Sequence, residues 1–134
     1  DTGINWTFSP MIDVARDPRW GRVSEGYGED PLVNSAFCIA SVKGYQGNDL
    51  TQSDTIAACL KHFVGYSESV AGIDYAYSDI SERAMWETYL PPYLAGIPPL
   101  YSLIFFTASG LKTEKSPKRC EELNKVASSN KIKF

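Results

Sequence analysis

The sequence has few residues of the kinds that bind metals. Of its 134 residues, one is histidine, His62, and three are cysteine: Cys38, Cys59 and Cys120. A single histidine excludes a metal centre built on several imidazoles. Three widely spaced cysteines exclude both a disulfide framework and a Cys-x-x-Cys metal site. We therefore expect a protein that uses no metal ion and no cofactor.

Long apolar runs and dense basic patches are also missing. The most apolar stretch, Leu94–Ala108, has about 15 residues and is interrupted by Pro98-Pro99, so it is too short for a membrane helix. Lysine and arginine number 13 against 16 acidic residues, and the net charge of −3 comes with no patch basic enough to bind nucleic acid. We expect neither a membrane nor a nucleic acid as partner. With 43% hydrophobic and 13% aromatic residues, the composition is that of a folded globular protein.

The charge is distributed unevenly along the chain. Residues 1–109 carry 6 basic and 13 acidic side chains, a net charge of −7, whereas residues 110–134 carry 7 basic and 3 acidic ones, a net charge of +4. The last 25 residues lack hydrophobic periodicity, which predicts a solvated or disordered tail. The alternative is an exposed helix over Cys120–Ala127.

Strand signals recur before this tail. Ile4–Ser9 alternates apolar and polar residues, which predicts a half-buried strand closed by Pro10. Thr55–Val64 is a short apolar segment between turn residues, which predicts a strand buried on both faces, as in a parallel sheet. Leu94–Ala108 is either a third strand or an apolar segment left exposed.

A first helix is predicted between the first two strands. Asp30 caps its free N–H groups and Pro31 suits its first position, so the helix begins there and runs to about Tyr45. Apolar and small residues at helical spacing predict its buried face: Val33, Phe37, Ala40 and Gly44.

A second helix is predicted after the buried strand. It begins at Asp79 or Ser81 and runs to about Leu90, where Pro91-Pro92 breaks it or restarts it toward Ile97. The resulting order of strand, helix, strand and helix predicts an α/β fold with a parallel sheet, either open or barrel-shaped.

Charged residues gather where the two strands end. The loop after the first strand contains Arg16, Asp17, Arg19 and Arg22 around Trp20. Such a loop is either a polar binding surface with an aromatic platform or an internal network of ion pairs that stiffens it. Glu29 and Asp30 are better explained as acidic residues at a helix N-terminus than as catalysts.

Lys61 and His62 lie at the carboxyl end of the buried strand. Ligands of parallel α/β folds bind at this end of the strands. The alternative is a histidine hydrogen-bonded inside the core beside a lysine that extends to solvent. The residue types and spacing alone do not choose between these two interpretations.

Six short motifs follow one another along the first 97 residues. They are Asp17–Arg22 (DPRWGR), Tyr27–Pro31 (YGEDP), Lys43–Gly47 (KGYQG), Ala57–Tyr66 (AACLKHFVGY), Ile80–Arg83 (ISER) and Glu87–Tyr93 (ETYLPPY). In this order and spacing they closely resemble the N-terminal domain of glycoside hydrolase family three. That family includes β-glucosidases, β-xylosidases and exo-β-glucanases.

The resemblance implies an α/β fold, a partial (β/α)8 barrel of the TIM type with two to three βα units. It implies a sugar pocket at the carboxyl ends of the strands, where Arg22, Lys61 and His62 bind hydroxyls in the subsite before the scissile bond. Glu25, three residues after Arg22, is expected to orient that arginine or to reach the pocket rim. The implied partner is a β-glucoside or related oligosaccharide, which the family hydrolyses with retention by means of two carboxyl groups.

Neither catalytic carboxyl group is assigned to this chain. The family's nucleophile is an aspartate in a Ser-Asp-Trp-like motif on a later strand, and its acid/base residue comes from a following domain. Ser78-Asp79 is followed by Ile80 and does not match that motif. The resemblance thus implies a fragment of a β-glucosidase-like glycoside hydrolase that is inactive by itself, secreted or periplasmic as its relatives often are. The alternative is a non-catalytic sugar-binding fragment or a mis-spliced product without activity.

The resemblance ends at about Ile97. We therefore expect two parts: residues 1–97, a partial N-terminal domain of the family, and residues 98–134, a divergent apolar stretch with a basic, disordered tail. The chain opens on Asp1 rather than methionine, so we expect it to be part of a longer reading frame. The sequence does not define an oligomeric state.

Overall fold

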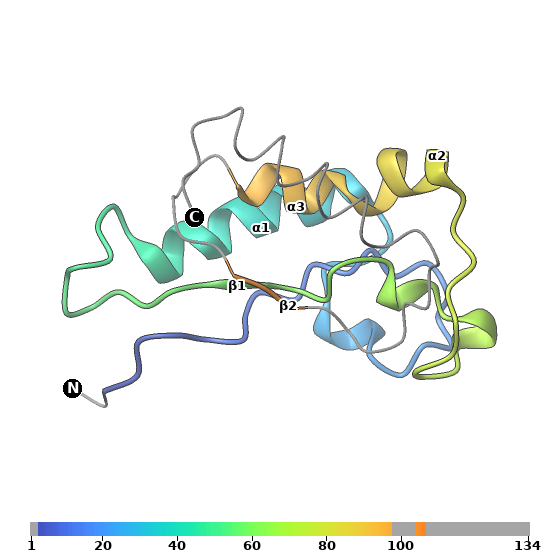
Figure 1. Ribbon diagram of the computed structural model, residues 1–134, viewed down its shortest axis with the longest axis horizontal. Coiled ribbons are helices and arrows are strands. Elements are labelled where there is room, and N and C mark those ends of the chain that lie inside the picture. Colours follow the sequence, from blue (N-terminus) through green and yellow to red (C-terminus); the bar gives the residue numbers. More distant parts are fainter. Residues whose placement is uncertain (1–2, 98–103, 107–134) are drawn as a thin grey trace.

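The computed structural model describes residues 3–97 and 104–106. In chain order its helices and strands are α1 (Pro31–Gln46), β1 (Cys59–Lys61), α2 (Glu82–Ala84), α3 (Pro91–Gly96) and β2 (Ile104–Phe106). β1 and β2 pair in parallel, with Cys59 opposite Ile104. Figure 1 shows α1 and α3 lying together along one side of this pair. The described part of the chain therefore has the predicted parallel α/β arrangement.

β1 lies between two parallel neighbours. β2 pairs with one of its edges, and backbone hydrogen bonds join its other edge to residues 5–12. Residues 58–60 have no exposed surface. This confirms a segment buried on both faces within Thr55–Val64, although only Cys59–Lys61 is a regular strand. β2 lies inside Leu94–Ala108, which confirms a third strand there.

The predicted strand over Ile4–Ser9 is not a regular strand. The segment forms isolated parallel bridges, which join Trp6 to Ala57 and Met11 to Lys61. Met11 lies five positions after Trp6, whereas Lys61 lies only four positions after Ala57. The first segment therefore has one extra residue between the two bridges, and this residue interrupts regular pairing. Pro10, which lies in this stretch, has no N–H to donate to the ladder.

Both ends of α1 lie where local sequence signals place them. One carboxylate oxygen of Asp30 accepts hydrogen bonds from the backbone N–H groups of Leu32 (2.7 Å) and Val33 (3.3 Å), and Pro31 occupies the first helical position. Gly47, with a φ of +56°, ends the helix just beyond its predicted last residue. The prediction of this helix is therefore confirmed.

The predicted buried face of α1 is wrong. Val33, Phe37, Ala40 and Gly44 are exposed, and the helix buries a different set: Asn34, Cys38, Val42 and Gln46. Two of the buried residues are polar and bond to the backbone rather than to solvent. The Gln46 side-chain oxygen accepts from the Ala58 N–H at 2.9 Å, and the Asn34 amide donates to the carbonyls of Gly28 and Asp30. Apolar periodicity misses a face whose polar members each hydrogen-bond to the backbone through one side-chain atom.

The second helical region begins at Ser81, one of its two predicted starts. The Ser81 hydroxyl accepts from the Ala84 N–H at 3.2 Å. α2 continues into a π-helical turn, Met85–Tyr89, and the chain restarts as α3 at Pro91. The two prolines therefore restart the helix, as one of the predicted alternatives held. The restart turns the buried face of α3 toward α1 and β1, which it contacts through Gly96.

One apolar cluster fills the space between the helices and the sheet. Its buried members come from the segment before α1, from the two layers and from the π-helical turn: Ile12, Val14, Cys38, Val42, Ala58, Leu60, Val64, Met85, Tyr89, Leu90 and Tyr93. The predicted tail over 98–134, apart from β2, and the alternative helix over 120–127 lie outside the described residues. Within the ranges 3–97 and 104–106, no helix is both long and apolar enough to cross a membrane.

Replacing Gly96 with alanine is expected to destabilise the protein. A methyl group at this position would lie 2.7 Å from Cys38 Sγ and 2.8 Å from Leu60 Cδ1. Both neighbours are buried, so the core must shift, at a cost of about 1–3 kcal/mol. The measurement is urea unfolding followed by tryptophan fluorescence.

Gly44→Ala in α1 is the matched control. Its new methyl group meets nothing within 4 Å, so the exchange is expected to stabilise the helix by about 0.5–1 kcal/mol. Equal unfolding midpoints for the two variants would contradict the close approach of α3 to α1 and β1.

Candidate functional site

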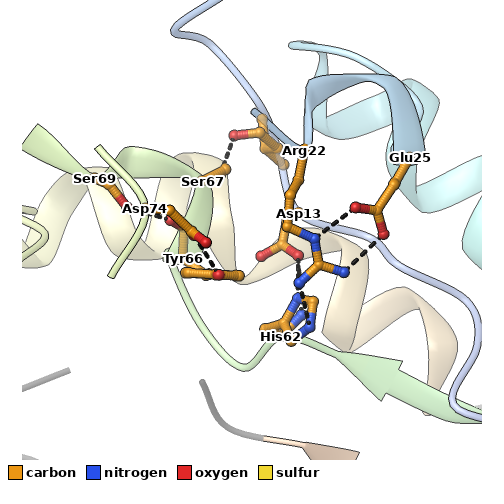
Figure 2. Close-up of polar contacts among 9 residues, drawn as sticks. Asp13, Arg22, Glu25, His62, Tyr66, Ser67, Ser69 and Asp74 are labelled. Carbon is orange, nitrogen blue, oxygen red and sulfur yellow. Dashed lines mark hydrogen bonds and ion pairs between the residues drawn. The ribbon is translucent and has the colours of Figure 1, made fainter. Parts of the chain in front are cut away.

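The candidate site lies at the carboxyl ends of β1 and of the segment beside it. Lys61 is the last residue of β1 and His62 follows it directly. Met11 is bridged to Lys61, and Asp13 lies two residues after Met11. The parallel pairing therefore brings Asp13 and His62 to the same edge. Figure 2 shows the residues that meet there. Polar groups from separate loops converge at this edge because parallel strands end on the same side.

Asp13 and His62 form a buried pair at the centre of the site. One carboxylate oxygen of Asp13 accepts from the His62 backbone N–H at 3.0 Å and lies 2.9 Å from ring atom Nδ1. The side chain of Asp13 has no exposed surface and that of His62 is 7% exposed. The two contacts fix both the backbone and the ring of His62.

Arg22 approaches His62 from the loop that follows Asp13. Its Nη1 lies 3.3 Å from His62 Nε2. Two further hydrogen bonds join its Nε and Nη2 to the two carboxylate oxygens of Glu25, at 2.6 and 2.7 Å. The turn Val23–Glu25 sets this spacing, and Figure 2 shows Arg22 between Glu25 and His62. A guanidinium held by a two-point contact keeps one orientation.

The charges of this group shift one another's pKa values. The hydrogen bonds from Arg22 lower the pKa of Glu25, with a smaller contribution from the ammonium of Lys61. The same hydrogen bonds raise the pKa of Arg22. Lys61 is half-buried, and its backbone N–H and C=O bond to Pro10 and Ile12. The structure thus joins Arg22 to Glu25 and to His62, and Lys61 is next to His62 in the chain.

Sequence reasoning missed two further residues of the site, Asp13 and Tyr66. The ring of Tyr66 lies 5.7 Å from the Arg22 guanidinium and meets the His62 ring edge-on at 4.8 Å between centroids. Its hydroxyl donates to Asp74. For Asp13 the available signal was a lone carboxylate in the apolar run Met11–Val14, because a charge there requires a buried partner.

The loop after β1 is tied to the chain beside Asp13. The Ser67 hydroxyl donates to the Val14 carbonyl at 2.7 Å, and Ser69 donates to the Tyr66 carbonyl at 2.8 Å. All three of Tyr66, Ser67 and Ser69 are buried. These bonds hold the Tyr66 ring in place beneath Arg22.

Asp17 and Arg19 have a structural role in the same loop. Arg19 donates to both carboxylate oxygens of Asp17, at distances from 2.7 to 3.2 Å, through its side chain and its backbone N–H. These bonds lower the pKa of Asp17 to about 2. For these two residues the contact agrees with the ion-pair interpretation. Within the part of the chain that the structure describes, no group of three His, Cys, Asp or Glu side chains could hold a metal ion.

The fold and the site together define a class of protein. Parallel strands carry helices on one side, and their carboxyl ends present a fixed guanidinium, an ammonium and an imidazole. This is a parallel α/β protein whose strand ends can bind an oxygen-rich ligand through charged hydrogen-bond donors.

The chain belongs to glycosyl hydrolase family 3. The sequence model of the family's N-terminal domain matches residues 1–109. This match confirms the resemblance and extends beyond Ile97, where we expected it to end. The chain is 41% identical over 97 residues to a periplasmic beta-glucosidase of Salmonella typhimurium, covering 72% of this chain and 13% of that one. It is 46% identical over 98 residues to a beta-xylosidase of Formosa agariphila, covering 71% and 14%.

Solved structures agree with these relatives. The fold superposes on the crystal structure of a beta-glucosidase from Listeria innocua in complex with glucose, with a TM-score of 0.74 and 45% identity. The match covers 78% of this chain and 15% of that one. The chain therefore spans about one seventh of the length of the relatives it matches.

Three buried tyrosines are expected to keep their protons in alkaline solution until the protein unfolds. Burial, followed by the Asp74 carboxylate, raises the pKa of Tyr66 to about 12. Burial and Glu68 raise the pKa of Tyr89, and burial raises that of Tyr93. Because these native pKa values exceed the unfolded value of about 10, the stability they contribute is complete below pH ~10 and is lost as the pH rises through the native values.

Phenolate absorbance at about pH 11 measures this difference. Adding urea is expected to increase the absorbance as the three tyrosines ionise. Tyr66→Phe is expected to reduce that increase by about a third, because it removes one of the three delayed phenols. Absorbance that does not change on unfolding would contradict the burial of these side chains.

Proposed function

We propose that this chain is part of a retaining β-glycosidase, similar to β-glucosidases, that removes terminal non-reducing β-linked sugars. The observation that carries the proposal is the joined set of Arg22, Glu25 and His62 at the strand ends, in a chain 45% identical to a Listeria innocua beta-glucosidase solved with glucose. The substrate class is a β-glucoside, a β-xyloside or a related oligosaccharide, since both activities occur in the names of its relatives.

The chemistry of the site suits a neutral sugar. A sugar offers hydroxyl groups, which both donate and accept hydrogen bonds, and charged donors bind them more strongly than neutral ones. We assign sugar binding to Arg22, Lys61 and His62. Glu25 holds Arg22 in its orientation. The side chain of Arg22 is 28% exposed, so a ligand can reach it without displacing the core.

The rest of the barrel and the catalytic carboxylates are assigned to other parts of a longer protein. Three parallel segments, residues 5–12, β1 and β2, agree with part of a (β/α)8 barrel, which needs roughly 250 residues to close. Retaining hydrolysis requires a nucleophilic carboxylate and an acid/base carboxyl group, and we place neither in this chain. The periplasmic relative supports a periplasmic or secreted location. The alternative is a sugar-binding fragment or a mis-spliced product without activity.

The 134-residue chain by itself is expected to hydrolyse no aryl β-glucoside. Without the nucleophile the reaction has no covalent path, so the loss is complete rather than partial. A chromogenic aryl β-glucoside assay of the purified chain measures this. Turnover that a β-glucosidase inhibitor abolishes would contradict the assignment of the carboxylates elsewhere.

In the longer enzyme, Arg22→Lys is expected to lower kcat/KM on aryl β-glucosides by about 10–100-fold. Lysine keeps the charge but cannot make the two-point contact with Glu25, so the donor facing His62 is no longer fixed. The magnitude corresponds to the loss of one hydrogen bond to a charged group, about 1.5–3 kcal/mol. Steady-state kinetics on β-glucoside and β-xyloside substrates provide the measurement.

Arg83→Lys is the matched control. Arg83 is 84% exposed and lies 3.8 Å from Glu87, so its replacement is expected to leave kcat/KM unchanged. If Arg22→Lys has the same small effect as Arg83→Lys, Arg22 does not bind the sugar.

A further inference from the structure

We propose that Asp13 is a positioning residue that holds His62 in the tautomer protonated on Nδ1, so that Nε2 is a hydrogen-bond acceptor in the sugar site. The tautomer is inferred from contacts within this chain. Its consequence for the ligand rests on the proposed function. None of the sequence motifs singled out Asp13.

The first step concerns the Nδ1 side of the ring. Asp13 Oδ2 lies 2.9 Å from Nδ1 and also accepts the His62 backbone N–H at 3.0 Å. A buried carboxylate oxygen is an acceptor, so the proton of this contact sits on Nδ1. The backbone beside Asp13 is held in place, because the Ile12 N–H donates to the Lys61 carbonyl at 2.8 Å. The carboxylate and the ring are therefore held by adjacent residues of two paired segments.

The second step concerns the other nitrogen of the ring. His62 Nε2 lies 3.3 Å from Arg22 Nη1, and a guanidinium has donors but no acceptor. Nε2 must therefore carry a lone pair in this contact, since a proton there would face an N–H group of the same positive sign. Arg22 is held by its two bonds to Glu25 and lies near the Tyr66 ring, so turning aside to admit that proton would break those bonds.

The two steps place an acceptor, Nε2, beside the donors of Arg22. A ligand hydroxyl that reaches both groups can donate its proton to the imidazole and accept one from the guanidinium. The 3.3 Å contact between Arg22 and His62 is long for a hydrogen bond, so it is readily exchanged for these two. A methyl ether, a fluorine or a carboxylate can accept from Arg22 but has no proton to give to Nε2. We infer that the site selects a free sugar hydroxyl at this position and rejects its ether, fluoro and uronic-acid counterparts.

The single histidine of the chain makes the tautomer directly measurable. In the full 134-residue chain labelled with ¹⁵N-histidine, one imidazole contributes all the side-chain signals. We expect Nδ1 in the protonated range of ¹⁵N shifts and Nε2 in the non-protonated range, in solution or in sedimented protein by solid-state NMR. A proton on Nε2, alone or together with one on Nδ1, would overturn the proposal.

Asp13→Asn separates a positioning role from a merely structural one. The variant keeps the shape of the side chain but removes its negative charge, so the proton on Nδ1 loses its ionic acceptor and the fraction of His62 protonated on Nε2 is expected to rise. Asp49→Asn, an identical exchange at an exposed loop residue, is the matched control and is expected to leave both nitrogen shifts unchanged.

Hydrogen exchange of the His62 backbone amide shows whether each sample is folded. The His62 backbone N–H donates to the same Asp13 oxygen, so in the unsubstituted chain it is expected to exchange slowly. Exchange as fast as in an unfolded peptide would contradict the buried pair itself. If Asp13→Asn is unfolded by this criterion, the nitrogen shifts of the unsubstituted chain alone decide whether the proton is on Nδ1 or on Nε2.

Sugar-binding titrations distinguish failure of this inference from failure of the proposed function. The probes are methyl β-glucoside and its monodeoxyfluoro analogues, titrated against the labelled chain. We expect one analogue to bind about tenfold more weakly or worse, and this penalty to shrink in Asp13→Asn. Equal binding of all analogues would overturn the acceptor role of Nε2. If none of the sugars binds while the tautomer is as stated, the sugar-binding function fails and the positioning role of Asp13 stands.

Discussion

The parallel pairing between residues 5–12 and β1 is the constraint on which the rest of the structure depends. Its hydrogen bonds fix which residues of the two segments lie side by side. Asp13 and His62, 49 residues apart in the chain, meet only because each follows a paired residue by one or two positions. A shift of register by one residue would turn every side chain to the opposite face and separate the pair.

The polar groups at the strand ends are organised as opposed pairs rather than as isolated charges. Asp13 bonds to His62, Glu25 to Arg22, and Asp74 to Tyr66. Pairs of this kind add little net stability, because removing charges from water offsets much of their attraction. Their effect is geometric, since each carboxylate fixes the orientation of the side chain that it bonds. The proposed sugar site therefore depends on orientation that is set before the ligand arrives.

The described part of the chain leaves several large apolar side chains exposed on its outer surface. Ile4, Trp6 and Phe8 are exposed beside β1, and Leu32 and Phe37 are exposed on α1. Large apolar side chains on one segment favour burial against another. The apolar residues that misled the prediction of the α1 face lie on this outer side. The periodicity thus recorded an apolar surface of α1, whereas the described residues bury the face that carries Asn34 and Gln46.

Features that depend on neighbouring residues in the chain were predictable from local sequence. The Asp30 cap, the Pro31 start, the Gly47 end and the restart at Pro91 all follow from local backbone chemistry. The order of motifs was enough to identify the family and to point to Arg22, Glu25, Lys61 and His62. Three features became visible only in the folded chain: the buried face of α1, the departure of the first segment from a regular strand, and the contacts of Asp13 and Tyr66 at the candidate site. These features depend on contacts between residues that lie tens of positions apart, and local sequence patterns do not determine the energies of such contacts.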